Sequence, residues 1–124
     1  MSNNLLVKQI LMQIAAATQT VQERFERIIT VEDFTHSPDG KMVLDSICML
    51  LIAIGDSLKK IDKLTEYKLL QQYHHIDWVG AKGTRDIIAH HYFDVDAEQI
   101  FFICQYHIEP LHATIQQMLY DLEK

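Results

Sequence analysis

The feature that most constrains the fold is a long series of apolar residues repeating with the period of an α-helix. Near the N-terminus these residues follow one another at steps of three or four: Leu6, Ile10, Ile14, Ala17, Val21, Phe25 and Ile28. Because a helix turns once in about 3.6 residues, they form one stripe along a single long helix. Such a helix is stable only when its stripe packs against another element. The chain is therefore expected to fold as a helical bundle.

Signals for helix ends divide the rest of the chain into further helices. Ser37 followed by Pro38 predicts the start of a second long helix, because serine caps free N–H groups and proline fits the first helical position. Thr65 is expected to cap a short helix that ends near Tyr73, and Asp77 to cap the next helix. The apolar stripe of the second long helix consists of Leu44, Ile47, Leu51, Ile54, Leu58 and Ile61.

The last predicted helix begins at Asp96, where Gln99 completes the pattern of a capping box. Its stripe contains Ile100, Cys104, Ile108, Leu111, Ile115, Met118 and Leu122. Pro110 removes an internal hydrogen bond and clashes with the preceding turn, so a bend or break is expected near residues 105–107. Together these elements predict an all-α, up-and-down bundle of four to five helices.

The composition favours one domain in the cytoplasm. A chain of 124 residues with 48% hydrophobic residues can bury one sizeable core but not two, so residues 1–124 are expected to form a single domain. No uncharged apolar run of about 18 residues is present, and the N-terminus does not resemble a secretion signal. Cys48 and Cys104 lie among apolar residues and are expected in the core rather than in a disulfide. We expect a cytoplasmic protein without a membrane segment.

The second long helix carries more apolar surface than one stripe requires. Met49, Ile52 and Ala53 extend its centre to a second side. Excess apolar surface is typical of a protein interface, so a homodimer using this region is one interpretation. The other is that this helix lies at the centre of the monomer's own bundle, and periodicity alone does not choose between them.

A short segment at the C-terminal end of the predicted helix that Asp77 caps contains groups suited to phosphoryl chemistry. Arg85 is followed by Asp86, then by His90 five positions after the arginine, and by Tyr92 two positions later. Arginine can bind a phosphate or stabilise charge that develops on one, and histidine changes its protonation near neutral pH. Arg85 and His90 are therefore the candidate catalytic residues, and Asp86 lies between them in the sequence.

The spacing limits what one regular helix can do with these side chains. Five residues correspond to about 140° around the axis, so Arg85 and His90 diverge, whereas Asp86 and His90 share a face. Either the helix unwinds near Ala89 to His91, or two copies of the motif meet across a twofold axis. A purely structural interpretation also exists, in which Arg85 pairs with Asp86 and His90 interacts with the negative end of the helix.

The spacing of Arg85, His90 and Tyr92 resembles that of the HEPN superfamily of ribonucleases, and in particular the HepT toxins of prokaryotic toxin–antitoxin pairs. The resemblance covers roughly residues 40–122. It implies a HEPN-like dimer with a composite active site in the interface, and Asp86 as support for His90. Other similar segments are Ile54-Gly55-Asp56, Ile76-Asp77-Trp78, Tyr92-Phe93-Asp94-Val95-Asp96 and the proline of the last helix.

This resemblance implies metal-independent cleavage of RNA by the toxin of a type VII-like toxin–antitoxin pair. In the implied reaction a ribose 2′-hydroxyl attacks the adjacent phosphorus, His90 transfers a proton as general acid or base, and Arg85 stabilises the phosphate charge. The products would carry a 2′,3′-cyclic phosphate. The resemblance also implies that a minimal nucleotidyltransferase antitoxin of the MntA type transfers AMP to Tyr92, where the added charge and bulk block RNA.

Charge is distributed unevenly along the chain. A net charge of −6 argues against a general nucleic-acid binder, because phosphate contacts usually come from a basic surface. Lys82 and His91 lie beside the motif and are the candidate RNA-binding residues. A local basic strip for RNA, or simply the solvated faces of helices, would explain the remaining cluster of Lys59, Lys60, Lys63 and Lys68.

Other classes of function receive less support. The histidines at 74, 75, 90 and 91 have no spacing typical of a zinc or di-metal site, so no metal and no cofactor is expected. No phosphate-binding glycine loop is present. The main alternative to an enzyme is a non-catalytic partner or substrate-binding subunit of a minimal nucleotidyltransferase, and a weaker one is a structural oligomerisation domain.

Overall fold

The computed structural model describes residues 2–91 and 93–124, and these ranges are helical without any strand. Six α-helices and one short 3-10 helix, η1, are present in them. The expectation of an all-α fold is confirmed. In chain order the elements are α1 (Ser2–Phe25), α2 (Glu32–Thr35), α3 (Pro38–Leu64), η1 (Leu70–Gln72), α4 (Trp78–His90), α5 (Ala97–Tyr106) and α6 (Ile108–Leu122).

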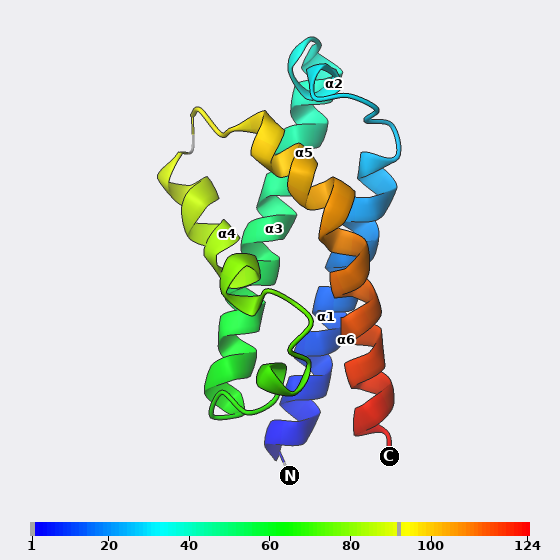
Figure 1. The fold of residues 1–124 in the computed structure, drawn as a ribbon, viewed down its shortest axis with the longest axis vertical. Helices are drawn as coiled ribbons and strands as arrows, with labels where there is room; N and C mark the ends of the chain where they lie inside the picture. The colour runs from blue at the N-terminus through cyan, green and yellow to red at the C-terminus, as the bar shows by residue number, and fades with distance from the viewer. Residues whose placement is uncertain (1, 92) are drawn as a thin grey trace.

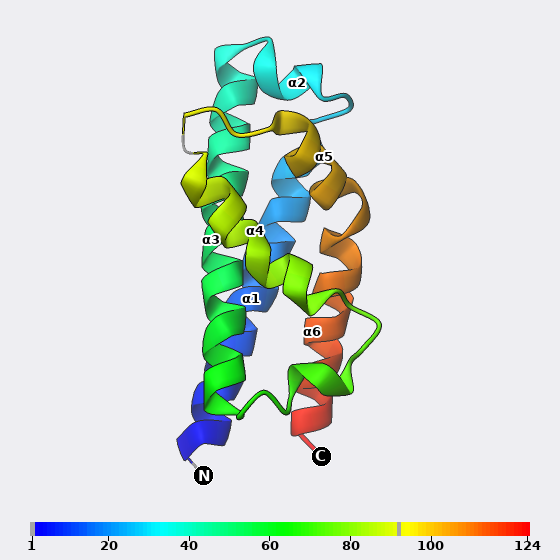
Figure 2. The same cartoon turned by 60° about the vertical axis from the view of Figure 1, so that its left-hand side comes forward.

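The three long helices α1, α3 and α6 run along the long axis of the molecule (Figure 1). α1 packs against both α3 and α6, and the two chain ends lie at the same end of the bundle. α2 covers the opposite end, where it contacts α3. Figure 2 shows α4 crossing diagonally over α3, which is the helix against which α4 mainly packs. α4 is thus an outer helix attached to one side of the bundle.

The predicted apolar stripes form the core except at two ends, where Leu6 near the start of α1 and Leu122 at the end of α6 are exposed. Ile10, Ile14 and Val21 are buried as expected. Leu6 is 43% exposed, and the neighbouring Val7 takes its place in the core. Small displacements of this kind arise because steps of three and four only approximate the helical period. At the α2 end the core is closed by three aromatic rings, those of Phe25, Phe34 and Phe101.

The predicted helix caps are present. The Ser37 hydroxyl accepts a hydrogen bond from the Gly40 N–H at 2.9 Å, and Pro38 occupies the first position of α3. The Asp96 carboxylate accepts from the backbone N–H of Glu98 and of Gln99 at the start of α5. These side chains satisfy backbone donors that a helix start otherwise leaves free. The helix starts at 38 and 97 therefore follow from local sequence.

Two details of the predicted helix list are wrong. Thr65 ends α3 instead of starting a helix through Tyr73, and its hydroxyl donates to the Ile61 carbonyl at 2.8 Å. Glu66 and Tyr67 then adopt the left-handed conformation, with φ of 53° and 63°, which stops the helix. Only the three-residue η1 follows. The predicted break near residues 105–107 is confirmed at His107. Because this break divides the last predicted helix into α5 and α6, the described residues contain more than the expected four to five helices.

Both cysteines lie in the core as free thiols. Burial raises the pKa of Cys48 to about 11 and that of Cys104 to about 12, so both are protonated at neutral pH. A buried, protonated thiol is a poor nucleophile. The expectation that they serve as core side chains is confirmed. In the described part of the chain, no helix is long and apolar enough to span a membrane.

Candidate active site

The helix that carries the motif is fixed at its N-terminus by a cap and an aromatic anchor. The Asp77 carboxylate accepts a hydrogen bond from the Gly80 N–H at 2.9 Å, as the sequence predicted. A Cβ atom at Gly80 would lie 2.4 Å from an Asp77 carboxylate oxygen, so a larger residue there would require the Asp77 side chain to shift. Trp78 is buried, and its indole N–H donates to the Tyr73 carbonyl at 3.0 Å. The start of α4 is therefore held in place.

At Gly55, α3 and α4 approach each other closely. A Cβ atom at Gly55 would lie 2.9 Å from the Cβ of Arg85 and 3.2 Å from the Lys82 carbonyl oxygen. Any larger residue would push the two helices apart, because buried helix contacts have no spare volume. The absence of a side chain at Gly55 thus brings the backbone at Arg85 directly against α3.

Arg85 is held by two carboxylates from two helices. Its Nε donates to Asp56 of α3 at 3.2 Å, and its Nη1 donates to Asp86 at 3.3 Å. The Arg85 side chain is 39% exposed, so it lies at the surface in a defined orientation. Lys59 of α3 lies 3.7 Å from the other oxygen of Asp86. Two cations and two carboxylates thus alternate across the contact between α3 and α4, and their formal charges balance.

Lys82 has a different environment from the one an RNA contact would need. Its ammonium group forms an ion pair with Asp62 of α3, whose side chain is only 5% exposed. The Lys82 side chain is itself 23% exposed. A carboxylate this deeply buried requires a counter-ion, which Lys82 supplies. The structure therefore gives Lys82 a role in joining α4 to α3, and its assignment as an RNA contact stays a prediction.

His90 is the last residue of α4 and, unlike Arg85, is exposed. The side chain of His90 forms no hydrogen bond or ion pair within residues 2–91 and 93–124. Because α4 is helical through His90, the unwinding that would turn His90 towards Arg85 does not occur before that residue. Asp86 contacts Arg85 and Lys59 in this arrangement. Within the described monomer, Arg85 and Asp86 are brought together and His90 is not.

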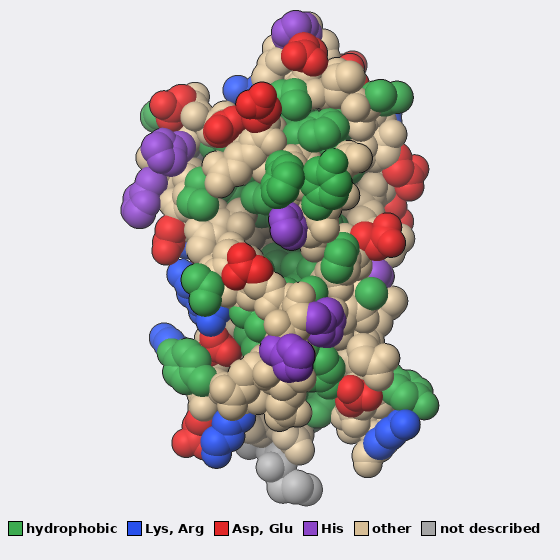
Figure 3. All heavy atoms as spheres, viewed as in Figure 1, with side chains coloured by type: hydrophobic (Ala, Val, Ile, Leu, Met, Phe, Trp, Pro, Cys, Tyr) green, Lys and Arg blue, Asp and Glu red, His purple; other side chains and the backbone are tan. Residues whose placement is uncertain are grey.

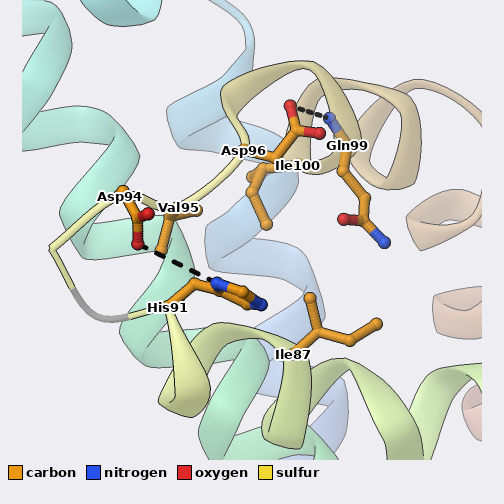
Figure 4. A pocket seen from close by; sticks show the side chains of 7 residues that line it. All are labelled: Ile87, His91, Asp94, Val95, Asp96, Gln99 and Ile100. Atoms are coloured by element: carbon orange, nitrogen blue, oxygen red, sulfur yellow. Dashed lines mark hydrogen bonds and ion pairs between the residues drawn. The ribbon is translucent and has the colours of Figure 1, made fainter.

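The segment after α4 borders a small cavity of about 300 Å³. Figure 4 shows Ile87 of α4, and His91 directly after α4, facing the chain that leads into α5. The Nδ1 of His91 lies 3.9 Å from the Asp94 carboxylate. Tyr92, the predicted site of AMP transfer, lies outside the described residues. His91 is exposed and stays a candidate RNA contact.

A larger cavity of about 500 Å³ separates α4 from α5 and α6. Hydrophobic side chains surround a hollow in this part of the surface (Figure 3), and Ile54 and Ile87 are among those that line it. α4 is therefore supported firmly by α3 on one side and weakly on the other. This asymmetry makes the contacts of Gly55, Arg85 and Lys82 with α3 decisive for where the motif lies.

Two of the other histidines have structural contacts. The Nε2 of His75 lies 2.9 Å from the Thr114 hydroxyl, and the Nδ1 of His112 lies 2.7 Å from the Thr18 hydroxyl. Each of these pairs links α6 to another part of the chain. In the part of the chain that the structure describes, no three histidine, cysteine or acidic side chains gather as a metal ion would require.

Sequence reasoning missed the roles of Asp56 and Lys59. Both lie on α3, and Asp56 is 29 residues away from the arginine that it contacts. No local pattern links them to the motif, because their proximity arises only when α4 packs on α3. The Gly55-Asp56 pair belongs to one of the segments that resemble the HepT toxins. In the structure this pair lies where α3 contacts Arg85.

Comparison with known proteins identifies the family. The model of a family described as ribonuclease HepT-like matches residues 14–118. Two proteins of Methanocaldococcus jannaschii, both named as candidate RNases, are also similar. One is 27% identical over 92 residues, which cover 74% of this chain and 76% of the relative, and the other is 26% identical over 99 residues, which cover 80% and 76%. No solved structure matches the chain. The family model spans most of the helical bundle and includes α4, and on that basis the chain belongs to the HepT-like ribonuclease family.

Proposed function

We propose that this protein is a metal-independent endoribonuclease that acts as the toxin of a type VII-like toxin–antitoxin pair. The observation that carries the proposal is the fixed, half-exposed guanidinium of Arg85 on the same helix as an exposed His90 without a partner in the described ranges. A ribonuclease of this kind needs a cation for the phosphate and a group that transfers protons. α4 supplies both types of group.

Arg85 would stabilise the negative charge that develops on the phosphate. Its Nε and one Nη1 hydrogen are used by Asp56 and Asp86, which leaves donors on the Nη1 and Nη2 end of the guanidinium. The two carboxylates fix the orientation of the group before RNA binds. A donor that is already oriented stabilises a transition state without reorganising during the reaction, which is the basis of electrostatic catalysis.

His90 would transfer the proton. The ribose 2′-oxygen attacks the adjacent phosphorus, the bond from phosphorus to the 5′-oxygen breaks, and the leaving oxygen takes a proton. The products are a 2′,3′-cyclic phosphate and a 5′-hydroxyl. An imidazole serves as base for the first oxygen or as acid for the second, because its protonation changes near neutral pH. Asp86, which contacts Arg85 and Lys59, would support the imidazole that transfers the proton.

A homodimer would complete the site. Val79, Gly83 and His90 share the exposed face of α4, because they are separated by four and seven residues. A Cβ atom at Gly83 would meet nothing within 4 Å, so the monomer has no packing reason for a residue that weakens the helix. A second copy crossing at Gly83 would place its own α4, and with it a second copy of the motif, close to this one.

The exposed face of α3 beside the motif also suits a dimer. Met49 is 72% exposed and Ala53 is exposed one turn further on, both of them N-terminal to Asp56. These residues belong to the apolar surface for which a dimer interface was one of the two interpretations of the sequence. A twofold contact over this part of α3 and the outer face of α4 would bury apolar surface and the two motifs together.

Regulation would act through Tyr92. An antitoxin of the MntA type, a minimal nucleotidyltransferase, would transfer AMP from ATP: the tyrosine oxygen attacks the α-phosphorus, pyrophosphate leaves, and the phenol proton goes to a base or to water. The adduct adds a negative charge two residues from His90. Repulsion of phosphate and steric blockage would then inhibit RNA cleavage.

The test is cleavage of mixed tRNA and mRNA by the purified protein with and without EDTA, beside His90→Ala. The expected result is cleavage that resists the chelator, leaves 2′,3′-cyclic phosphate ends and disappears in the variant. His74→Ala is a matched control, because His74 is an exposed histidine outside the motif. Absence of cleavage by unmodified wild-type protein would reject the enzyme and favour the non-catalytic partner subunit.

A further inference from the structure

The exposed face of α3 changes its chemistry where it passes Arg85. On the N-terminal side of Asp56 the face presents apolar side chains, with Met42 68% and Met49 72% exposed. On the C-terminal side it presents three lysines, Lys59, Lys60 and Lys63, which we call the lysine strip. These residues follow Asp56 by three, four and seven positions and therefore lie on one side of the helix with it. The strip begins beside the Arg85 guanidinium.

The acidic groups near the strip are already paired. Asp56 contacts Arg85, Asp62 contacts Lys82, and Glu66 lies 3.8 Å from Lys68. Lys60 and Lys63 have no ion pair within the described ranges. Residues 56–68 and 82–86 contain six cations and four carboxylates, although the whole chain carries a charge of −6. The strip is thus a locally positive region on an acidic protein.

Figure 3 shows where this region lies on the surface. Lysine and arginine side chains gather along the left edge, where α4 and the C-terminal half of α3 run in Figure 1, and histidine side chains project above them at the end of α4. Asp56 and Asp86 offset the charges of Arg85 and Lys59. Arg85 alone is therefore a weak attractor for a polyanion, and further cations are needed to bring a phosphate backbone to it.

We propose that the lysine strip binds the phosphate backbone of a single RNA strand and positions it at Arg85. Lys60 and Lys63 supply the free charges, and Lys59 lies at the end of the strip nearest Arg85. This inference rests on the proposed function for its choice of RNA. The seven-residue step from Asp56 to Lys63 spans about 10 Å of helix, and the strip is one helix face wide, which suits one strand rather than a duplex. Lysines bind phosphates as point charges without reading sequence, so the strip would supply affinity and direction.

Lys63 also lies in the last turn of α3, where a cation stabilises the helix dipole. That role affects folding and not RNA binding, so the two roles can be separated.

The probe is a fluorescein-labelled 12-nucleotide RNA with 2′-O-methyl groups, which lacks the attacking hydroxyl and cannot be cleaved. The dissociation constant is measured by anisotropy between 0.05 and 0.3 M NaCl, salt conditions chosen because counter-ion release makes such binding salt-dependent.

The double variant Lys60→Gln with Lys63→Gln keeps long side chains and removes two charges. The control is Arg27→Gln with Lys41→Gln, which removes two exposed charges outside the strip and changes the net charge equally. Melting temperatures are measured for both. For single strands each phosphate contact contributes about 0.7 to the slope of log K against log salt. The strip variant is expected to lose about 1.4 from the slope and to bind about 25-fold more weakly at 0.1 M salt.

The control should keep the wild-type slope. Equal affinities of strip and control variants would overturn the inference, and so would displacement of the probe by oligoglutamate as effective as by unlabelled RNA, which would indicate an acidic protein partner. The proposed function is decided separately by cleavage of unmodified RNA. Strip-dependent binding without cleavage would support the strip and reject the nuclease, whereas cleavage with equal affinities would do the reverse.

Discussion

Arg85 and His90 lie on the same helix but in opposite situations. Arg85 is fastened to α3 by Asp56 through its side chain and by the close approach of Gly55 at its Cβ. His90 ends α4 in an exposed position without a partner in the described ranges. From this contrast we propose that the monomer alone builds the part of the site that would bind phosphate. We propose that a second copy of the chain completes the part of the site that transfers the proton.

The largest effect on RNA cleavage is expected at His90, an exposed residue that contributes little to folding. His90→Ala should lower RNA cleavage by about 10²- to 10⁴-fold, the usual contribution of a positioned proton-transfer group. Because His90 is exposed, the free energy of unfolding should change by less than about 0.5 kcal/mol. Cleavage rates and urea denaturation measure the two effects, with His74→Ala as the matched variant. A large loss of stability would show that His90 has a structural role.

The opposite pattern is expected at Lys82. Lys82→Met leaves Asp62 buried without a counter-ion, which should destabilise the fold by about 3–5 kcal/mol. The double variant Lys82→Met with Asp62→Leu should recover most of that stability, because no buried charge then remains. Urea denaturation of the three proteins measures the difference. If the single variant is as stable as wild type, the ion pair is not what fastens α4 to α3.

Gly55→Ala tests whether the close contact between α3 and Arg85 matters for activity. The added methyl group would lie 2.9 Å from the Arg85 Cβ, and overpacking of this kind costs about 1–3 kcal/mol. The gain in helix propensity offsets about 1 kcal/mol of that cost. We therefore expect a modest loss of stability together with slower cleavage, since α4 must move. Unchanged cleavage would mean that the position of Arg85 against α3 does not matter for activity.

Gly83→Ala is the smallest change and should have the opposite sign in the monomer. Nothing lies within 4 Å of the added Cβ, so stability should rise by about 0.5–1 kcal/mol. If a second copy crosses at Gly83, the same methyl group should weaken dimerisation. Sedimentation velocity over a range of protein concentrations measures that effect. Unaltered or stronger self-association would place the dimer contact elsewhere.

The sequence predicted those parts of the molecule that depend on local interactions. The caps at Ser37, Asp77 and Asp96 and the break at His107 follow from residues within one turn of each position. The left-handed residues at 66 and 67 were not predicted, because neither is a glycine or an asparagine. The predicted helix from Thr65 to about Tyr73 is absent because these two residues interrupt the helical conformation.

The site was predicted only in part, for a related reason. The motif residues are close in sequence and were recognised from their spacing. Asp56, Asp62 and Lys59 approach the motif only through the packing of α4 on α3, and no periodicity encodes that contact. The same packing explains why Lys82, which looks like a free cation in the sequence, is tied to a buried carboxylate.

The most direct test of the composite site is complementation between two inactive variants. Arg85→Ala and His90→Ala proteins are purified separately, mixed under conditions that exchange subunits, and assayed for RNA cleavage. If Arg85 of one copy works with His90 of the other, each mixed dimer regains one intact site, and the mixture should recover about a quarter of wild-type activity. If the mixture stays as inactive as its components while exchange is demonstrated, Arg85 and His90 do not act together across a dimer interface.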